Sequence, residues 1–382
     1  MKIVYIIKSL AAPYGTERIL IDKMNYLADK LSYKIYIITY EQGNHSVIFP
    51  LSSKITHIDL NTRFFTLKKH NIVKKLLLYI ILRIQFKCKL KQNIKKIDPN
   101  FVIFTNYSFH LTDTIVNLNE KYQKIFESHV SKESIGLRFN SQNTKIKYFI
   151  ATFYDNYILK KIKKCSALVT LTNADSNSWK SYKNSITIPN FVTMYPNNPN
   201  NTKNKKQIIS VGRLEKQKGY DILINIWKIV HLKHPEWILK IYGSGSEKAL
   251  LEHMINNLGL SDTCIINDPV PDIYNKYQES SIYVMSSRYE GFGLVLTEAM
   301  SCALPCISFK CPHGPEEIIS NEIDGFLIEP YNTNLFAEKI CYLIENEDLR
   351  LTMGLNARNN VKRYLSDNIM SQWVKLFNTL SN

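Results

Sequence analysis

The chain has 382 residues, of which 45% are hydrophobic and 21% charged, and its formal net charge is +16. At roughly 150 residues per domain this length predicts two or three domains with real cores, which excludes disordered and collagen-like proteins. The apolar stretch Leu76–Ile84 is far shorter than the ~20 residues of a membrane-spanning helix and contains Arg83, so we expect no transmembrane segment. The first 15 residues have their apolar core broken by Lys8 and are interpreted as a strand, not a secretory signal. Seven cysteines without a Cys-x-x-Cys pair suit a reducing cytoplasm.

Short β-branched runs alternate with helical patterns along the whole chain. The expected strands of the first half are 2–7, 34–39, 101–106, 124–128 and 167–172. In the second half they are 207–212, 238–243, 264–267, 282–286 and 305–309, with helices expected at 219–234, 247–258, 272–280 and 293–301. Near-continuous apolar strands separated by helices are typical of parallel sheets covered on both faces. The pattern therefore predicts an α/β protein with two doubly wound domains.

A segment with little to bury divides the two halves. Thr193–Lys206 is rich in proline, asparagine and lysine, as linkers are. We expect a first domain at 1–192, a linker at 193–206 and a second domain at 207–382, whose last helix is free to pack back on the first domain. Ligands of doubly wound sheets bind at the carboxyl ends of the strands, and the cleft between two facing domains is the expected site.

The positive charge lies in the first half. Residues 1–195 hold 30 Lys and Arg against 12 Asp and Glu, whereas the remaining residues hold 19 against 21. The densest stretch, Lys68–Lys96, contains ten cations and no acid around its apolar core. A basic helix of this kind is attracted to an anionic membrane surface. A lysine-rich solvated face explains the same pattern, and no recognition motif supports binding to nucleic acid.

Two segments place charged side chains where a strand meets a helix. In Ser210–Leu223, Arg213 and Lys218 supply two fixed cations, which a departing diphosphate requires. Each is also compatible with an ordinary surface charge. In Ser286–Met300, glycines at a helix N-terminus allow backbone amides to approach an anion.

The second of these segments also holds two carboxylates suited to sugar and ribose hydroxyls, Glu290 and Glu298. Its turn, Gly291–Phe292–Gly293, is also common in loops of no special function. Gly15 follows the first strand and can bring backbone amides to a phosphate. His129 follows the strand at 124–128, where a histidine is as easily a structural residue. No cluster has metal-ligand spacing and no Asp-x-Asp motif occurs, so no metal or other cofactor is expected.

Four motifs together resemble those of the retaining, family-4 glycosyltransferases of the GT-B fold, also called glycosyl transferases group 1. They are GRLEKQKG at 212–219, SSRYEGFGLVLTEAM at 286–300, GPEEII at 314–319 and DGFLIEP at 324–330. The resemblance covers essentially the whole chain and implies an acceptor-binding first domain and a nucleotide-sugar-binding second domain, both Rossmann-like.

The resemblance also implies roles for individual residues. It implies that Arg213 and Lys218 bind the donor diphosphate, that Glu290 and the amides of Gly291, Phe292 and Gly293 hold the donor sugar, and that Glu298 binds the ribose. Gly15 matches the second glycine of the family's N-terminal Gly-Gly loop, with Tyr14 in place of the first. His129 corresponds to the family's active-site histidine.

The expected activity is retaining transfer of a hexosyl or N-acetylhexosaminyl group from a UDP-sugar, or a GDP-sugar, to a glycan acceptor. The acceptor is expected to be lipid-linked and to belong to a bacterial surface polysaccharide such as capsule, O-antigen or exopolysaccharide. The enzyme would then be cytoplasmic and peripheral on the inner face of the cell membrane, without a nucleic-acid partner. The alternatives are a non-catalytic glycan- or nucleic-acid-binding protein and a GT-B nucleotide-sugar epimerase or phosphorylase.

Overall fold

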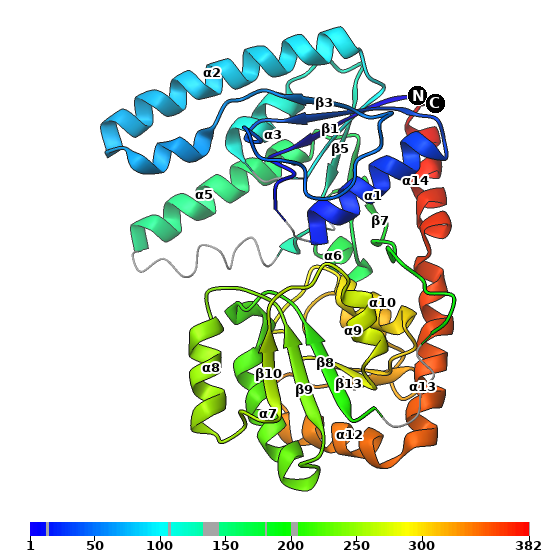
Figure 1. Ribbon diagram of the computed structural model, residues 1–382. Coiled ribbons are helices and arrows are strands. Elements are labelled where there is room, and N and C mark those ends of the chain that lie inside the picture. The colour runs from blue at the N-terminus through cyan, green and yellow to red at the C-terminus, as the bar shows by residue number, and fades with distance from the viewer. Residues whose placement is uncertain (13–14, 106–107, 133–144, 180–181, 200–204, 382) are drawn as a thin grey trace. The chain divides into compact units, whose positions relative to one another are not determined.

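The computed structural model describes residues 1–12, 15–105, 108–132, 145–179, 182–199 and 205–381 (Figure 1). The chain divides into two compact units. The first unit comprises Met1–Leu171, Asp175–Ile188 and Met370–Asn382, and the second comprises Thr172–Ala174 and Pro189–Ile369. Apart from the short segment Thr172–Ala174, the chain passes from the first unit to the second after Ile188, and it returns at Met370, so most of the last helix belongs to the first unit.

The first unit contains a seven-stranded sheet whose strands all run parallel. In spatial order the strands are β3 (Thr56–Asp59), β2 (Lys34–Thr39), β1 (Lys2–Ile7), β4 (Phe101–Phe104), β5 (Gln123–Glu127), β6 (Ala167–Thr170) and β7 (Ser185–Thr187). In this register Val4 of β1 lies beside Tyr36 on one side and Val102 on the other. The strand β4 and all of β1 after Lys2 consist of buried apolar residues, as expected for a sheet with helices on both faces.

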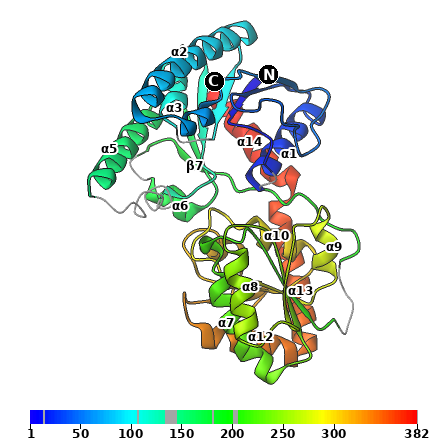
Figure 2. The same ribbon diagram turned by 60° about the vertical axis from the view of Figure 1, so that its left-hand side comes forward.

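Two groups of helices cover this sheet (Figure 2). The helices of the first unit are α1 (Gly15–Asp29), α2 (Ile72–Ile97), α3 (Phe109–Val116), α5 (Lys145–Ile162), α6 (Asn173–Ser178) and α14 (Ser366–Ser381), with a 3-10 turn, η1, at Phe64–Lys69. The helices α2, α3 and α5 share one core with the sheet residues Val4 and Val102. On the other face, Phe377 of α14 packs on Phe101 with ring centroids 4.8 Å apart. None of the described helices is long and apolar enough to cross a membrane.

The second unit contains a six-stranded parallel sheet. In spatial order its strands are β10 (Cys264–Asn267), β9 (Ile238–Tyr242), β8 (Gln207–Val211), β11 (Ile282–Met285), β12 (Cys306–Phe309) and β13 (Gly325–Ile328). Its helices are α7 (Tyr220–Lys233), α8 (Lys248–Asn257), α9 (Ile273–Gln278), α10 (Leu294–Ser301), α11 (Pro315–Ile318), α12 (Thr333–Glu345) and α13 (Glu347–Asn360), with 3-10 turns η2 (Lys216–Lys218) and η3 (Val361–Tyr364). Helices α7, α8 and α12 share one core on one face of the sheet, and α9 and α10 lie on the other.

The prediction of two doubly wound α/β domains is confirmed, and every expected strand is present within a residue or two. Three strands, β3, β7 and β13, were not predicted as strands. The first has polar residues at three of its four positions, the second has three residues, and the third begins at Gly325, so none has an apolar run of ordinary length. Of the expected linker, 193–199 has no helix or strand, and 200–204 lies outside the described residues.

Candidate active site

The second unit has a topological switch point between β8 and β11. These strands are neighbours in the sheet, but the chain leaves β8 for α7 on one face and leaves β11 for α10 on the other. In such sheets the two loops diverge and a crevice forms at the carboxyl ends of the strands. The segments 212–219 and 286–293 follow these two strands, and they contain most of the residues that the sequence predicts for the site.

Gly219 brings the two segments together. Its φ is +66°, and a Cβ built on it would lie 2.2 Å from the carbonyl oxygen of Ser286, so only glycine fits without a shift of the backbone. The backbone amide of Arg288 donates to the carbonyl of Gln217 at 2.8 Å, and Gln217 Nε2 donates to the carbonyl of Tyr289 at 2.9 Å. These contacts hold the two loops in a fixed relation.

Lys218 and Glu290 meet where the loops join. Lys218 Nζ donates to Glu290 Oε1 at 2.7 Å, and the same oxygen accepts from Ser287 Oγ at 2.6 Å. The side chains of Lys218 and Glu290 are only 14% and 7% exposed, so their charges interact with less screening than surface charges do. The structure thus brings together two residues that the sequence predicts for the donor site.

Arg213 lies at the open side of the same loop. It is exposed, and its Nη2 donates to Gln217 Oε1 at 3.1 Å. Gly212, just before it, has Lys218 as a close neighbour, because a Cβ there would lie 3.1 Å from Lys218 Cε. The β8 loop therefore carries two exposed cations, Arg213 and Lys216, and one part-buried cation, Lys218.

The turn Gly291–Phe292–Gly293 leads into α10. Phe292 is buried, and Gly293, with φ +99°, is the N-cap residue just before α10. A Cβ on Gly314 would lie 1.9 Å from the carbonyl oxygen of Phe292, so the GPEEII segment packs directly on this turn. Glu298, within α10, is 8% exposed and accepts from the Tyr277 hydroxyl at 3.2 Å.

In the first unit the predicted residues are Gly15 and His129. Gly15 is the first residue of α1, whereas Tyr14 lies outside the described residues. His129 follows β5, and its Nε2 lies 3.1 Å from Oε1 of Glu127, the last residue of that strand. The other oxygen of Glu127 accepts from Lys23 Nζ.

Lys23 and Glu127 form a fully buried ion pair. Burial alone raises the pKa of Glu127, but Lys23 and His129 outweigh it and lower this pKa to about 2. Burial lowers the pKa of Lys23, and Glu127 opposes that shift. The ammonium also lies 4.0 Å from the ring centroid of Trp373 in α14. The carboxylate beside His129 is therefore ionised at neutral pH.

Sequence reasoning missed Lys23, Glu127 and Ser287. Glu127 ends an apolar strand, which is the one signal for it. Lys23 belongs to a helix with charged residues on both sides, and nothing distinguishes it from a surface lysine. Ser287 lies within the motif at 286–300 but only its contact with Glu290 gives it a role.

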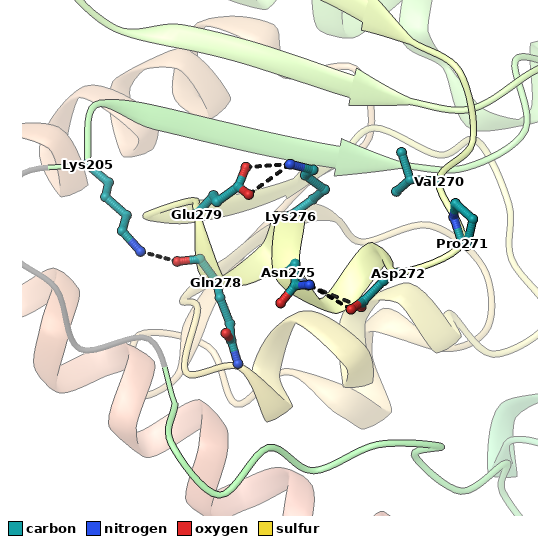
Figure 3. Close-up of a pocket in the computed structure, with 8 residues that line it drawn as sticks. All are labelled: Lys205, Val270, Pro271, Asp272, Asn275, Lys276, Gln278 and Glu279. Atoms are coloured by element: carbon teal, nitrogen blue, oxygen red, sulfur yellow. Dashed lines mark hydrogen bonds and ion pairs between the residues drawn. The ribbon is translucent and has the colours of Figure 1, made fainter.

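A hollow elsewhere in the second unit holds none of these residues (Figure 3). It has a volume of about 610 Å³ and is lined by Lys205 and by seven residues between Val270 and Glu279. Its polar groups bind one another: Lys276 pairs with Glu279 at 2.8 Å, and Asn275 donates to Asp272 at 2.6 Å. Within the described part of the chain, no three His, Cys, Asp or Glu side chains are grouped as metal ligands.

Known proteins similar to this chain point to one family. Residues 193–360 match the family described as "Glycosyl transferases group 1". An uncharacterized glycosyltransferase of Haemophilus influenzae is 29% identical over 97% of this chain and 98% of its own length. The amylovoran biosynthesis glycosyltransferase AmsD of Erwinia amylovora is 34% identical over 55% of this chain and 62% of its own length. A structure of Staphylococcus aureus TarM, a variant in complex with fondaparinux, alpha-GlcNAc-glycerol and UDP, matches with a TM-score of 0.79 and 18% identity over 99% of both chains.

Two Rossmann-like units with parallel sheets, matched over their whole length by such structures, define the GT-B fold. Residues 193–360 match the group 1 glycosyltransferases of that fold, and the chain is a glycosyltransferase. The expected fold and family are thereby confirmed. Retention of anomeric configuration and the roles of the individual site residues stay predictions.

Proposed function

We propose that this glycosyltransferase is retaining and transfers a hexosyl or N-acetylhexosaminyl group from a nucleoside diphosphate sugar to a glycan of a bacterial surface polysaccharide. UDP is favoured over GDP as the nucleotide. Two similar proteins support this choice: one is named for amylovoran biosynthesis, and the other was crystallised with UDP and alpha-GlcNAc-glycerol. The observation that carries the proposal is the part-buried contact of Lys218 with Glu290 at the switch point of the second sheet.

The charges of this cluster suit the transfer. As the bond to the donor sugar breaks, negative charge builds up on the departing diphosphate, and fixed cations in a site of low polarity stabilise it. Lys218 and Arg213 supply those cations, so we propose that the reaction needs no metal. Glu290 balances Lys218 when no donor is bound, and its carboxylate is suited to accept hydrogen bonds from sugar hydroxyls. Glu298 is proposed to bind the ribose.

Retention of the anomeric configuration determines how the acceptor reacts. Its hydroxyl attacks the face of the sugar from which the diphosphate leaves, and a phosphate oxygen accepts the proton of that hydroxyl. His129 is proposed to be the active-site histidine of the first unit, where its Nε2 lies 3.1 Å from Oε1 of the ionised Glu127. The acceptor is proposed to be lipid-linked, with the enzyme working at the inner face of the cell membrane.

The test uses purified protein and a panel of UDP- and GDP-sugars, with nucleotide release as the readout. We expect slow hydrolysis of one donor, unchanged in EDTA, and a loss of ~10²-fold or more in Lys218→Met and Arg213→Met. Lys216→Met is the control, because Lys216 is an exposed cation of the same loop. Hydrolysis of no donor, a strict need for Mg²⁺ or Mn²⁺, or equal loss in the control would overturn the proposal or its assignment of the cations.

A further inference from the structure

Helix α2 exposes a stripe of aliphatic side chains along its first half. The residues of this apolar stripe are Ile72, Val73, Leu76, Leu77, Ile80, Ile81 and Ile84, and each is 48–85% exposed. At 3.6 residues per turn, these positions fall within about half of the helix circumference, so they form one continuous face. Single exposed aliphatic residues are ordinary, but a contiguous exposed patch marks a binding surface.

The second half of α2 holds the helix on the unit. Phe86, Leu90, Ile94 and Ile97 are at most 6% exposed and belong to the core of the first sheet. The apolar stripe is thus carried by a helix of 26 residues, about 39 Å long at 1.5 Å per residue, that is anchored at its far end. Figure 1 shows the first half of α2 extending away from the strands.

Exposed lysines continue the same face beyond the stripe. Lys87, Lys91 and Lys95 lie about 60°, 100° and 140° around the helix from Ile72, within the half-circumference that the stripe occupies. No acidic residue occurs between Phe64 and Ile97. Two other cations of this segment have internal partners: Arg83 pairs with Asp113 at 3.0 Å, and Lys89 donates to the carbonyl of Leu60 at 2.7 Å. One helix face therefore presents seven aliphatic side chains followed by three cations.

We propose that α2 is the surface by which this protein binds an anionic lipid bilayer, lying in the plane of the interface. The stripe inserts among the acyl chains near the headgroups, and Lys87, Lys91 and Lys95 contact the anionic headgroups. This proposal rests on the proposed function only in giving the lipid-linked acceptor a place, because its support is the exposed face itself.

Two other occupants fit the face less well. A second copy of the chain would bring its own α2 lysines against these, and like charges repel. A nucleic acid would bind the lysines, but the exposed aliphatic residues have no partner on a phosphate backbone. A bilayer with anionic lipid offers acyl chains to the apolar stripe and negative headgroups to the lysines.

A natural cysteine allows this surface to be labelled with a fluorescent probe. Cys88 lies on the face of the stripe and is exposed, whereas the other six cysteines are buried. An environment-sensitive maleimide dye will therefore label Cys88 alone. We expect a blue shift and co-sedimentation with vesicles of phosphatidylglycerol and phosphatidylcholine at low salt, partial release at 0.5 M salt, and neither effect with phosphatidylcholine alone.

Variants separate the apolar and the electrostatic contributions. Leu76→Gln with Ile80→Gln should weaken vesicle binding at least tenfold and abolish the fraction that resists salt. Lys87→Gln, Lys91→Gln and Lys95→Gln together should weaken it on the order of 100-fold, since each cation near such a surface contributes about fivefold. The matched controls change exposed residues of the second unit: Leu232 and Leu250, which are 77% and 57% exposed, and Lys228, Lys233 and Lys362. They should bind vesicles as the parent does.

The outcomes are distinct. Equal binding by parent and stripe variants overturns the proposal, as does a lipid-free dimer that the stripe variants dissociate while vesicles fail to bind. Binding to DNA without binding to vesicles overturns it as well. Hydrolysis of a soluble donor, measured alongside, should be unchanged in every variant. If no donor is hydrolysed but vesicles bind through α2, the proposed function fails and this surface stands.

Discussion

Each unit holds a shielded Lys–Glu pair near the carboxyl end of a parallel strand, and the two pairs differ in how they are built. Lys218 and Glu290 belong to two loops that glycines and backbone hydrogen bonds hold together. Lys23 and Glu127 are 104 positions apart, on a helix and a strand, and neither sequence indicates that the two residues meet. A charge pair can thus be predicted from the sequence when turn residues surround it. It cannot be predicted when only tertiary packing brings the two partners together.

The largest effect is expected from breaking the pair of the first unit. Lys23→Met leaves the Glu127 carboxylate buried without its ammonium, and losing one partner of a buried pair costs about 3–5 kcal/mol of unfolding free energy. The control is Lys248→Met in the second unit, which removes a 2.7 Å pair with Asp268 whose side chains are 37% and 77% exposed. That change should cost less than about 1 kcal/mol. Urea unfolding measures both.

The double variant Lys23→Met, Glu127→Leu sharpens this test. Because both charges are removed together, no unpaired carboxylate remains, and most of the lost stability should return. A double variant less stable than Lys23→Met alone would show that Glu127 stabilises the unit through contacts other than this pair.

The second unit is expected to be most sensitive at Gly219. Gly219→Ala adds a Cβ 2.2 Å from the Ser286 carbonyl oxygen in a backbone conformation with φ +66°. Gly259→Ala is the matched control, since Gly259 has φ +69° and no atom within 4 Å of the added Cβ. The control should lose about 1 kcal/mol of unfolding free energy, because alanine disfavours a positive φ. Gly219→Ala should lose about 3 kcal/mol of unfolding free energy, and it should also lose donor hydrolysis. Equal losses would mean that the two loops separate without penalty.

The same difference explains which parts of the fold and of the candidate site could be predicted from the sequence. The parallel sheets, their helices and the segments around Lys218 and Glu290 were predicted because apolar runs and glycine-rich turns signal them locally. The strand β7 was missed because three residues carry too short a pattern. Lys23 was missed because its burial depends on Glu127 and on Trp373 of the last helix, and no local pattern encodes such a contact. The exposure of the stripe on α2 is likewise a tertiary property.

An intermediate effect is expected from His110, on α3 of the first unit. Burial, with help from Arg83 and Lys8, lowers its pKa to about 4, and its ring stacks on Phe64 at 3.9 Å. Since the folded pKa lies below the ordinary 6.5, the unfolded chain takes up the proton first as the pH falls. Stability is therefore lost between pH 6.5 and 4, by about 2 kcal/mol from pH 7.5 to pH 5.

His110→Phe isolates this contribution, because phenylalanine suits the aromatic surroundings and has no titrating group. We expect the variant to lose about 2 kcal/mol less than the parent over the same pH range in urea unfolding. Hydrogen exchange should place the difference in 109–116 and not in the α7 segment 220–233. Parallel pH profiles for parent and variant would show that His110 does not titrate in this range.

The smallest effect is expected at Ser287, whose hydroxyl donates to Glu290 Oε1 at 2.6 Å. Ser287→Ala leaves Lys218 as a partner of that oxygen, so the carboxylate keeps its charge balance and loses one hydrogen bond, about 1 kcal/mol. If Glu290 acts on the donor sugar, turnover should fall roughly fivefold, and binding of free UDP, measured by calorimetry, should not change. Ser286→Ala is the control, since that hydroxyl donates to the Lys218 carbonyl at 3.0 Å and not to the carboxylate.

In the background of Glu290→Gln, the Ser287 change should have less effect, because the two act through one oxygen. Full additivity of the two changes would instead separate Ser287 from Glu290 and leave Lys218 as the residue that orients the carboxylate.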